Sequence, residues 1–182
     1  MSLPGKILEL HKSLEGAGVP HAFGGALALA WCTQRARGTI DVDVNLFVPP
    51  GEAAMVLGAL PSEVRWGPED VARIEDNGQV RLWWDATPID VFFNTTDFHE
   101  RVAERARLEP FMGADVPFLS CRDLAVFKAF FDRTKDWADL EEMASAGALE
   151  VEAVLGVLVR YLGGDDHRVE RVRRLAPPEP RR

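Results

Sequence analysis

The segment from Thr39 to Val48 alternates strictly between apolar and polar side chains, and it constrains the fold more than any other part of the chain. Successive side chains of a β-strand point to opposite faces of the sheet, so this period of two predicts a strand with one buried face. The residues of the apolar face are Ile40, Val42, Val44 and Leu46. The residues of the polar face are Asp41, Asp43 and Asn45. A sheet that buries one side of this strand therefore presents two carboxylates on the other.

Two neighbouring carboxylates repel each other, and proteins accept that cost where a divalent cation lies between them, since Mg²⁺ prefers carboxylate oxygens, phosphate and water. A third acid, Asp90, lies in the apolar run Pro88–Phe93, which has the character of a strand. If the two strands are neighbours, Asp90 points at the same spot as Asp41 and Asp43, and three acids around metal ions can activate a hydroxyl group. On spacing alone, a solvent-facing strand with surface acids is the simpler explanation.

The same acids also match part of a calcium-binding loop. Asp41, Asp43, Asn45 and Glu52 occupy its positions 1, 3, 5 and 12. The sixth position of such a loop needs glycine for a sharp turn, and this chain has Leu46 there. The β-alternation contradicts a looped conformation as well, which excludes the calcium loop. The four histidines of the chain show no metal-ligand spacing.

A glycine pair, Gly24-Gly25, follows a predicted strand at residues 19–23 and precedes a predicted helix at residues 26–34. The start of a helix presents free backbone N–H groups that favour phosphate, and the missing side chains allow close approach. Any tight turn after a strand also uses glycine, so the pair alone does not decide between the two readings.

The other segments predict a mixed α/β chain. Further helices are expected at residues 3–16, 52–60, 97–107, 136–146, 150–162 and 165–175, and one more begins at the Ser120–Asp123 cap. Further strands are expected at residues 71–75, 79–84, 88–94 and 111–119. The chain should therefore hold an α/β (α+β) core at residues 1–119, followed by a helical region at residues 120–182 that ends in a loose tail.

Composition limits the kinds of partner and the compartment. The net charge of −8 argues against broad coating of a nucleic-acid backbone, although a local basic patch stays compatible with it. Two cysteines, Cys32 and Cys121, make no disulfide framework and are expected to be buried thiols in a reducing compartment. Trp66, Trp83, Trp84 and Trp137 are expected to be packed in the core or half-buried, and a base-stacking platform is the alternative. The sequence shows neither a signal peptide nor a membrane span, so we expect a cytoplasmic protein.

Three motifs together resemble the nucleotidyltransferase superfamily, and within it the small bacterial proteins related to abortive-infection nucleotidyltransferase toxins. They are His21-Ala-Phe-Gly-Gly-Ala-Leu-Ala-Leu29, Arg37-Gly-Thr-Ile-Asp-Val-Asp-Val44 and Pro88-Ile-Asp-Val-Phe92. A helical motif downstream, from Lys128 to Leu140, is similar to that family too, and the resemblance covers about residues 15–145. It implies a nucleotidyltransferase-like mixed sheet flanked by helices.

The resemblance also implies roles for individual residues. Asp41 and Asp43 match the acids that bind Mg²⁺ or Mn²⁺, and Asp90 matches the third acid, which helps deprotonate the acceptor hydroxyl. Arg37 and Thr39 match the Arg-x-Thr that precedes the acidic pair.

Further positions of the same resemblance concern the phosphates. Gly24 and Gly25 match the glycine motif that grips nucleotide phosphates, and Lys128 matches a lysine that reaches the triphosphate. Asp136 and Asp139 match downstream acids to which no role is assigned. Many members have Gly-Ser where this chain has Gly-Gly, so one hydroxyl contact to phosphate is missing.

The function that the resemblance implies is transfer of a nucleoside monophosphate from an NTP to an acceptor hydroxyl, with release of pyrophosphate. The acceptor stays open among a tRNA end, a protein hydroxyl and a small molecule. The alternative is a non-catalytic nucleotide-binding or interaction module on the same fold, such as one component of a toxin–antitoxin pair. Partners on either reading include a cognate antitoxin or further copies of this chain. A third alternative is an acidic scaffold whose carboxylates bind nothing.

Overall fold

The computed structural model describes residues 1–35 and 38–176, and the described chain divides into two compact units. The first unit is built from Met1–Leu27 and Arg37–Leu119, and the second from Ala28–Ala36 and Ser120–Arg182, as far as these segments are described. Helix α2 (Gly25–Thr33) begins in the first unit and ends in the second. The sequence-based division into residues 1–119 and 120–182 stays a prediction about domains.

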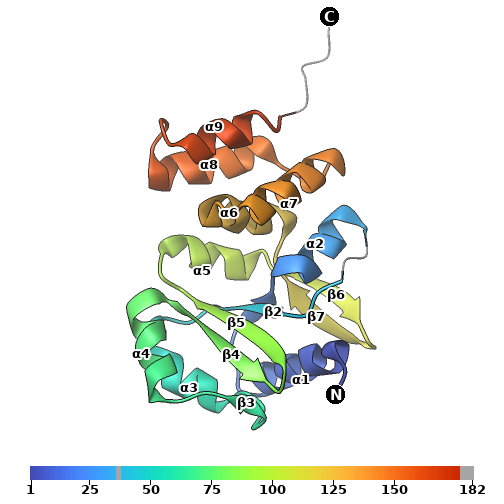
Figure 1. The fold of residues 1–182 in the computed structure, drawn as a ribbon, viewed down its shortest axis with the longest axis vertical. Coiled ribbons are helices and arrows are strands. Elements are labelled where there is room, and N and C mark those ends of the chain that lie inside the picture. Colours follow the sequence, from blue (N-terminus) through green and yellow to red (C-terminus); the bar gives the residue numbers. More distant parts are fainter. Residues whose placement is uncertain (36–37, 177–182) are drawn as a thin grey trace, which may run out of the picture. The chain divides into compact units, whose positions relative to one another are not determined.

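The strands of the first unit form one mixed sheet, which confirms the predicted α/β class. Within the described residues the strands are β1 (His21–Phe23), β2 (Val42–Leu46), β3 (Val64–Arg65), β4 (Gln79–Trp84), β5 (Thr87–Phe93), β6 (Arg107–Phe111) and β7 (Ala114–Phe118). Their order across the sheet is β3-β4-β5-β2-β1-β7-β6 (Figure 1). The pairs β2–β5 and β1–β7 are parallel, and the other pairs are antiparallel.

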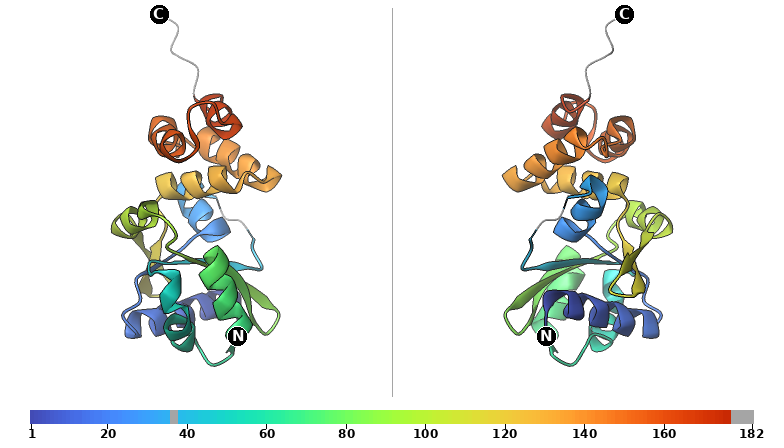
Figure 2. Two further views of the ribbon diagram at one scale, coloured as in Figure 1. Left: turned by 90° about the vertical axis from the view of Figure 1, so that its left-hand side faces the viewer. Right: turned by 90° about the vertical axis from the view of Figure 1, so that its right-hand side faces the viewer.

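Helices cover one face of this sheet, the face to which the apolar side chains of the strands point. The helices are α1 (Leu3–Gly16), α3 (Ala53–Gly58), preceded by a 3-10 turn at Pro50–Glu52, and α4 (Pro68–Asn77). They lie on the same side of the sheet in Figures 1 and 2. Lys6 Nζ of α1 lies 5.5 Å from the centre of the Trp84 ring, and the even-numbered side chains of β4 are the buried ones, so these side chains point to this side. Val42, Val44 and Leu46 of β2 are fully buried.

The prediction of a strand at residues 71–75 is wrong, because this segment belongs to α4. The local signals for a helix are complete. Pro68 stands in the first turn, the Asp70 carboxylate accepts the Gly67 N–H at 3.0 Å, and the helix ends at Gly78. The strand prediction did not take these caps into account.

Other predicted boundaries shift by a few residues. The strand predicted at residues 39–48 pairs only over Val42–Leu46. The extended segment predicted at residues 111–119 is the second half of the β6–β7 hairpin, and the short edge strand β3 was not predicted. Helix α5 (Asp97–Glu104) ends three residues before the predicted end.

The second unit is helical, as predicted for this part of the chain. Besides the end of α2, its helices are α6 (Cys121–Phe131), α7 (Thr134–Ser145), α8 (Val151–Leu162) and α9 (His167–Arg173). They pack against one another (Figures 1 and 2). The Ser120 hydroxyl accepts the Asp123 N–H at 3.1 Å, which is the predicted cap of α6.

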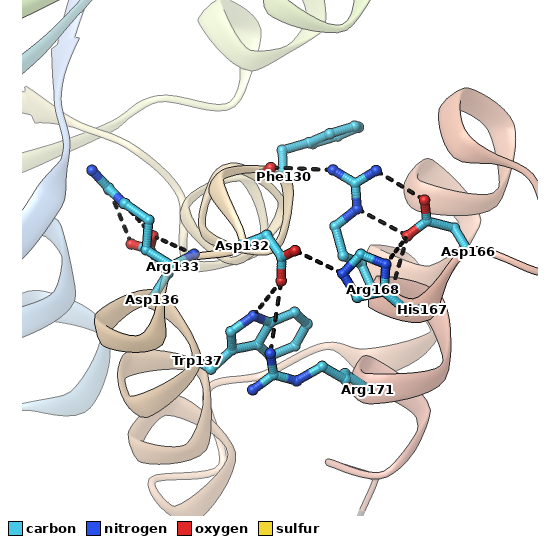
Figure 3. A network of polar contacts seen from close by, with 9 residues as sticks. All are labelled: Phe130, Asp132, Arg133, Asp136, Trp137, Asp166, His167, Arg168 and Arg171. Atoms are coloured by element: carbon cyan, nitrogen blue, oxygen red, sulfur yellow. Dashed lines mark hydrogen bonds and ion pairs between the residues drawn. The ribbon is translucent and has the colours of Figure 1, made fainter.

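A polar network ties the end of α6 to α9 (Figure 3). Asp132 accepts from Trp137 Nε1 and from His167 Nε2, both at 2.7 Å. Burial opposes ionisation, but the hydrogen bonds from His167 and Trp137 outweigh it and lower the pKa of Asp132. The Arg171 guanidinium lies 3.9 Å from the centre of the Trp137 ring. The C-terminal arginines that face this network therefore have structural partners within the unit.

Cys32 of α2 and Cys121 of α6 form a disulfide, with their Cα atoms 5.5 Å apart. The expectation of two free buried thiols is wrong. Counting cysteines gives no information on distance, and the two residues are 89 positions apart in the chain. Disulfides persist in oxidising compartments, so the bond counts against the reasoning that led to a cytoplasmic location, which stays a prediction. No helix within the described ranges has the length and apolar character that a membrane crossing requires.

Candidate active site

Asp43 and Asp90 are direct register partners on the adjacent parallel strands β2 and β5. Neighbouring strands lie about 4.8 Å apart, so both carboxylates leave the same face of the sheet from adjoining positions. This face is opposite to the one covered by α1, because the strand neighbours Val44 and Val91 are fully buried there. The structure therefore brings together two acids that are separated by 46 intervening residues in the sequence.

Asp41 lies just before β2, where pairing with β5 has not yet begun. The Thr39 hydroxyl donates to Asp41 Oδ1 and to the Asp41 carbonyl oxygen, and it accepts the Asp41 N–H at 3.3 Å. Thr39 thus orients the first acid. Arg37 lies outside the described residues. Ile40, expected on the buried face, is 81% exposed, because no neighbouring strand covers the chain before Val42.

The glycine pair packs directly against Asp43. The Gly24 N–H donates to the Asp43 carbonyl oxygen at 2.9 Å, and Gly25 adopts a positive φ of 55°. A Cβ atom at Gly25 would lie 1.8 Å from Asp43 Oδ2, and one at Gly24 would lie 3.2 Å from Asn45 Nδ2. The turn before α2 therefore contacts the acidic strand directly. Gly25 has no room for a side chain, and a Cβ atom at Gly24 would need small shifts of its neighbours.

Arg81 of β4 is a site residue that sequence reasoning missed. It is the register partner of Asp90, donating from Nε at 2.7 Å and from the second guanidinium nitrogen at 2.6 Å to the two carboxylate oxygens. The hydrogen bonds that Arg81 donates to Asp90, followed by the negative charges of Asp90, Asp41 and Asp43, raise the pKa of Arg81. The guanidinium therefore lies within the field of all three acids. The alternation in residues 79–84, paired with the strand at residues 88–94, was the signal that could have placed it there.

The donor set suits a hard divalent cation, because all three candidate ligands are carboxylates. In the described ranges, however, no three acids, histidines or cysteines are arranged as a ready metal-binding group. Arg81 engages both carboxylate oxygens of Asp90. The chemistry of the side chains fits the metal, and a metal ion held by Asp90 would share this carboxylate with Arg81.

Lys128 lies in the second unit and is itself tightly paired. Its Nζ donates to Asp139 Oδ2 at 2.6 Å and lies 3.9 Å from Asp136 Oδ1. All three residues are buried, and Asp136 also accepts from Arg133 Nε at 2.6 Å. The two downstream acids, Asp136 and Asp139, therefore hold the lysine. Its proposed reach to a triphosphate stays a prediction.

No protein-family model matches the sequence, and the search of curated proteins found no match either. Solved structures do match. ANT(2'')-Ia in complex with adenylyl-2''-tobramycin has a TM-score of 0.60 at 15% identity, over 97% of this chain and 100% of its own. The lincomycin-bound lincosamide antibiotic adenylyltransferase LnuA has a TM-score of 0.53 at 12% identity, over 78% of this chain and 96% of its own.

An antigenic nucleotidyltransferase-like protein from Paracoccidioides brasiliensis also matches, with a TM-score of 0.53 at 16% identity over 92% of each chain. At these identities the likeness shows the fold. The chain therefore has the nucleotidyltransferase fold, and the resemblance that its motifs suggested is confirmed at that level.

Proposed function

We propose that this protein transfers a nucleoside monophosphate from an NTP to an acceptor hydroxyl. The observation that carries the proposal is the pairing of Asp43 with Asp90 on adjacent parallel strands, with Gly24-Gly25 packed against Asp43. On a nucleotidyltransferase fold, this arrangement supplies a phosphate-binding turn and a carboxylate cluster next to each other. The acidic scaffold without a ligand offers no reason for glycines in contact with an acid.

In the proposed reaction the acceptor oxygen forms a bond to the α-phosphorus, and the bond between this phosphorus and the α,β-bridging oxygen breaks. Pyrophosphate leaves with that oxygen, and the hydroxyl proton passes to Asp90. The turn at Gly24 and Gly25 binds the phosphates through backbone N–H groups. Mg²⁺ or Mn²⁺, held by Asp41, Asp43 and Asp90, would neutralise the phosphate charge. Thr39 keeps Asp41 in place, Lys128 and Arg37 are proposed phosphate contacts, and positioning and charge neutralisation provide most of the rate.

Small hydroxyl compounds are the first acceptors to test. Of the two matching structures, LnuA is a lincosamide antibiotic adenylyltransferase, and ANT(2'')-Ia is in complex with adenylyl-2''-tobramycin. A tRNA end and a protein hydroxyl stay open, as do a cognate antitoxin, a homo-oligomer and a cytoplasmic location.

The second candidate function is a non-catalytic nucleotide-binding module, and two observations favour it. Both oxygens of Asp90 are taken by Arg81, and Lys128 is buried between two acids. A module would bind an NTP and transfer nothing. This difference defines the test.

The test incubates the protein with Mg²⁺ and each α-labelled NTP in turn, together with a bacterial lysate that is fractionated into RNA, protein and small molecules. Asp43→Asn and Asp90→Asn remove the proposed acids, and Asp76→Asn is the control because Asp76 is an exposed carboxylate on α4. Label in one fraction, kept in the control and lost in both site variants, supports the transferase. NTP binding without transfer supports the module. If the protein neither binds an NTP nor transfers label, both candidate functions are rejected.

A further inference from the structure

The order of the strands predicts where an acceptor would lie, and this inference rests on the proposed function. In a displacement at phosphorus the attacking oxygen and the leaving oxygen stand roughly in line on opposite sides. The phosphate-binding turn follows β1, the first acids belong to β2 and the third acid to β5. The next strands in the same direction are β4 and β3, seen at one edge of the sheet in Figure 1. An acceptor on the far side of Asp90 from the glycine turn would lie over β4 and β3.

The side chains that β4 and β3 present on this face are identified by the register. Arg81 is opposite Asp90, Trp83 is opposite Pro88, and Arg65 of β3 is opposite Trp83. Direct cross-strand partners point to the same face. Arg65, Arg81 and Trp83 therefore stand on the acid-bearing face, beyond Asp90 as seen from the glycine turn.

Trp83 is 46% exposed, whereas Trp84, the next residue on the same strand, is 2% exposed. Trp84 and Trp137 are buried in the core, whereas Trp83 keeps nearly half of its surface exposed. An exposed indole that is flanked by two guanidinium groups on a sheet offers a flat apolar surface with positive charge at its border.

The arginine side chains on this face have N–H donors for a ligand. Arginine has five N–H donors, and Arg81 uses two of them on Asp90, which leaves three. Residues two apart on a strand are about 7 Å apart and cross-strand partners about 5 Å apart, so both guanidinium groups can reach one molecule that lies on the indole.

We propose that Trp83, Arg65 and Arg81 form the acceptor subsite, and that the acceptor is a hydroxyl compound with a ring and a negative charge. The ring lies on the indole, and the anionic group accepts from the guanidinium groups. Arg81 joins the two halves of the site, because it contacts both Asp90 and the acceptor. A polyamino sugar would meet two like charges here, so the subsite selects against it.

The test uses three compounds that differ in charge but share the phenyl group, the pyranose ring and most hydroxyls: phenyl β-D-glucuronide, phenyl β-D-glucoside and phenyl β-D-glucosaminide. Their affinities for the full-length protein are measured by calorimetry in Mg²⁺. We expect the anionic glucuronide to bind most tightly and the cationic glucosaminide least tightly. Trp83→Ala should weaken the glucuronide complex about 2- to 10-fold, and Arg65→Gln about 10-fold.

Matched controls separate this surface from general effects. Trp66→Ala removes another exposed tryptophan, and Arg101→Gln removes an exposed arginine on α5. Both should bind the glucuronide like the wild type. Circular dichroism spectra verify that each variant is folded.

The outcomes for the subsite and for the proposed function differ. The subsite is rejected if none of the three compounds binds, if the glucosaminide binds most tightly, or if Trp83→Ala and Trp66→Ala behave alike. The same samples are titrated with each NTP and Mg²⁺. Absence of NTP binding by the wild type contradicts the proposed function, whereas NTP binding that Trp83→Ala leaves intact, together with a lost preference for the anion, supports the subsite.

Discussion

Gly25 has a backbone conformation and a neighbour that both exclude a side chain. Its φ of 55° lies in the left-handed region, and a Cβ atom would overlap with Asp43 Oδ2. We predict that Gly25→Ala displaces the Asp43 carboxylate and lowers the free energy of unfolding by about 1–2 kcal/mol from backbone strain alone. Urea unfolding measures the stability, and calorimetry with an NTP and Mg²⁺ measures the site.

Gly51→Ala is the control for this variant, because a Cβ atom at Gly51 would meet no atom within 4 Å. It should retain both stability and NTP binding. Wild-type binding by Gly25→Ala would show that the contact between the glycine turn and Asp43 has no part in the site.

Lys128 has a structural role in addition to its proposed contact with the phosphates. It is 6% exposed and neutralises two buried carboxylates, those of Asp139 and Asp136. We predict that Lys128→Met lowers the free energy of unfolding by about 3 kcal/mol or more, because it leaves buried charge without its cation. Lys135→Met, at an exposed position of α7, should change the stability by less than about 0.5 kcal/mol. Equal stability of the two variants would contradict the structural role.

At the scale of elements, a pair of histidines joins α1 to β1. His11 Nδ1 and His21 Nε2 are 3.0 Å apart, and His21 Nδ1 lies 2.8 Å from the Val19 carbonyl oxygen. The carbonyl only accepts, so Nδ1 of His21 carries the proton and Nε2 accepts from His11. Burial lowers the pKa of His21 below its usual 6.5, the charge of His11 lowers it further, and the Val19 hydrogen bond and Glu15 oppose this.

This pair makes the stability depend on pH. The lowered pKa means that the unfolded chain binds more protons below pH 6.5, so the free energy of unfolding falls as the pH drops from about 6.5 toward the folded-state pKa. His99, whose pKa is also lowered by burial, contributes with the same sign. We expect thermal unfolding between pH 5 and 8 to show this loss, with a smaller slope in His21→Gln. An unchanged slope would contradict the prediction.

The pairing of elements also explains what the sequence could and could not predict. The alternation at residues 39–48 and the apolar run around Asp90 were strong enough to predict two strands. That these strands are neighbours was only a condition of the argument, which the pairing of β2 with β5 meets. Arg81 was not predicted as a residue of the candidate site, because its position opposite Asp90 depends on the register between β4 and β5, which no local pattern contains. The contact between Lys128 and Asp139 was not predicted for the same reason, since it depends on how α6 packs against α7.

At the scale of the whole molecule, the disulfide between Cys32 and Cys121 closes a loop of 89 residues that includes β2 to β7. A cross-link of this length restricts the unfolded chain, and the chain-entropy model assigns it up to about 4–5 kcal/mol of stability. We predict that dithiothreitol lowers the melting temperature of the wild type. The double variant Cys32→Ser/Cys121→Ser should melt at the lower temperature with or without the reductant. A reductant effect on the double variant, or none on the wild type, would contradict this.

The strand order has a consequence for how such a protein changes its substrate. The glycine turn and the acids come from residues 21–46 and from β5, whereas Arg65, Arg81 and Trp83 come from residues 64–84, a continuous stretch inserted between them. This stretch forms the sheet edge through β3 and β4, and β2 and β5 pair without it. On the proposed function, the residues for the chemistry and the residues for acceptor selectivity thus lie in separate segments of the sequence. A chimaera that receives residues 62–86 from another protein of this fold should exchange the acceptor and keep the nucleotide.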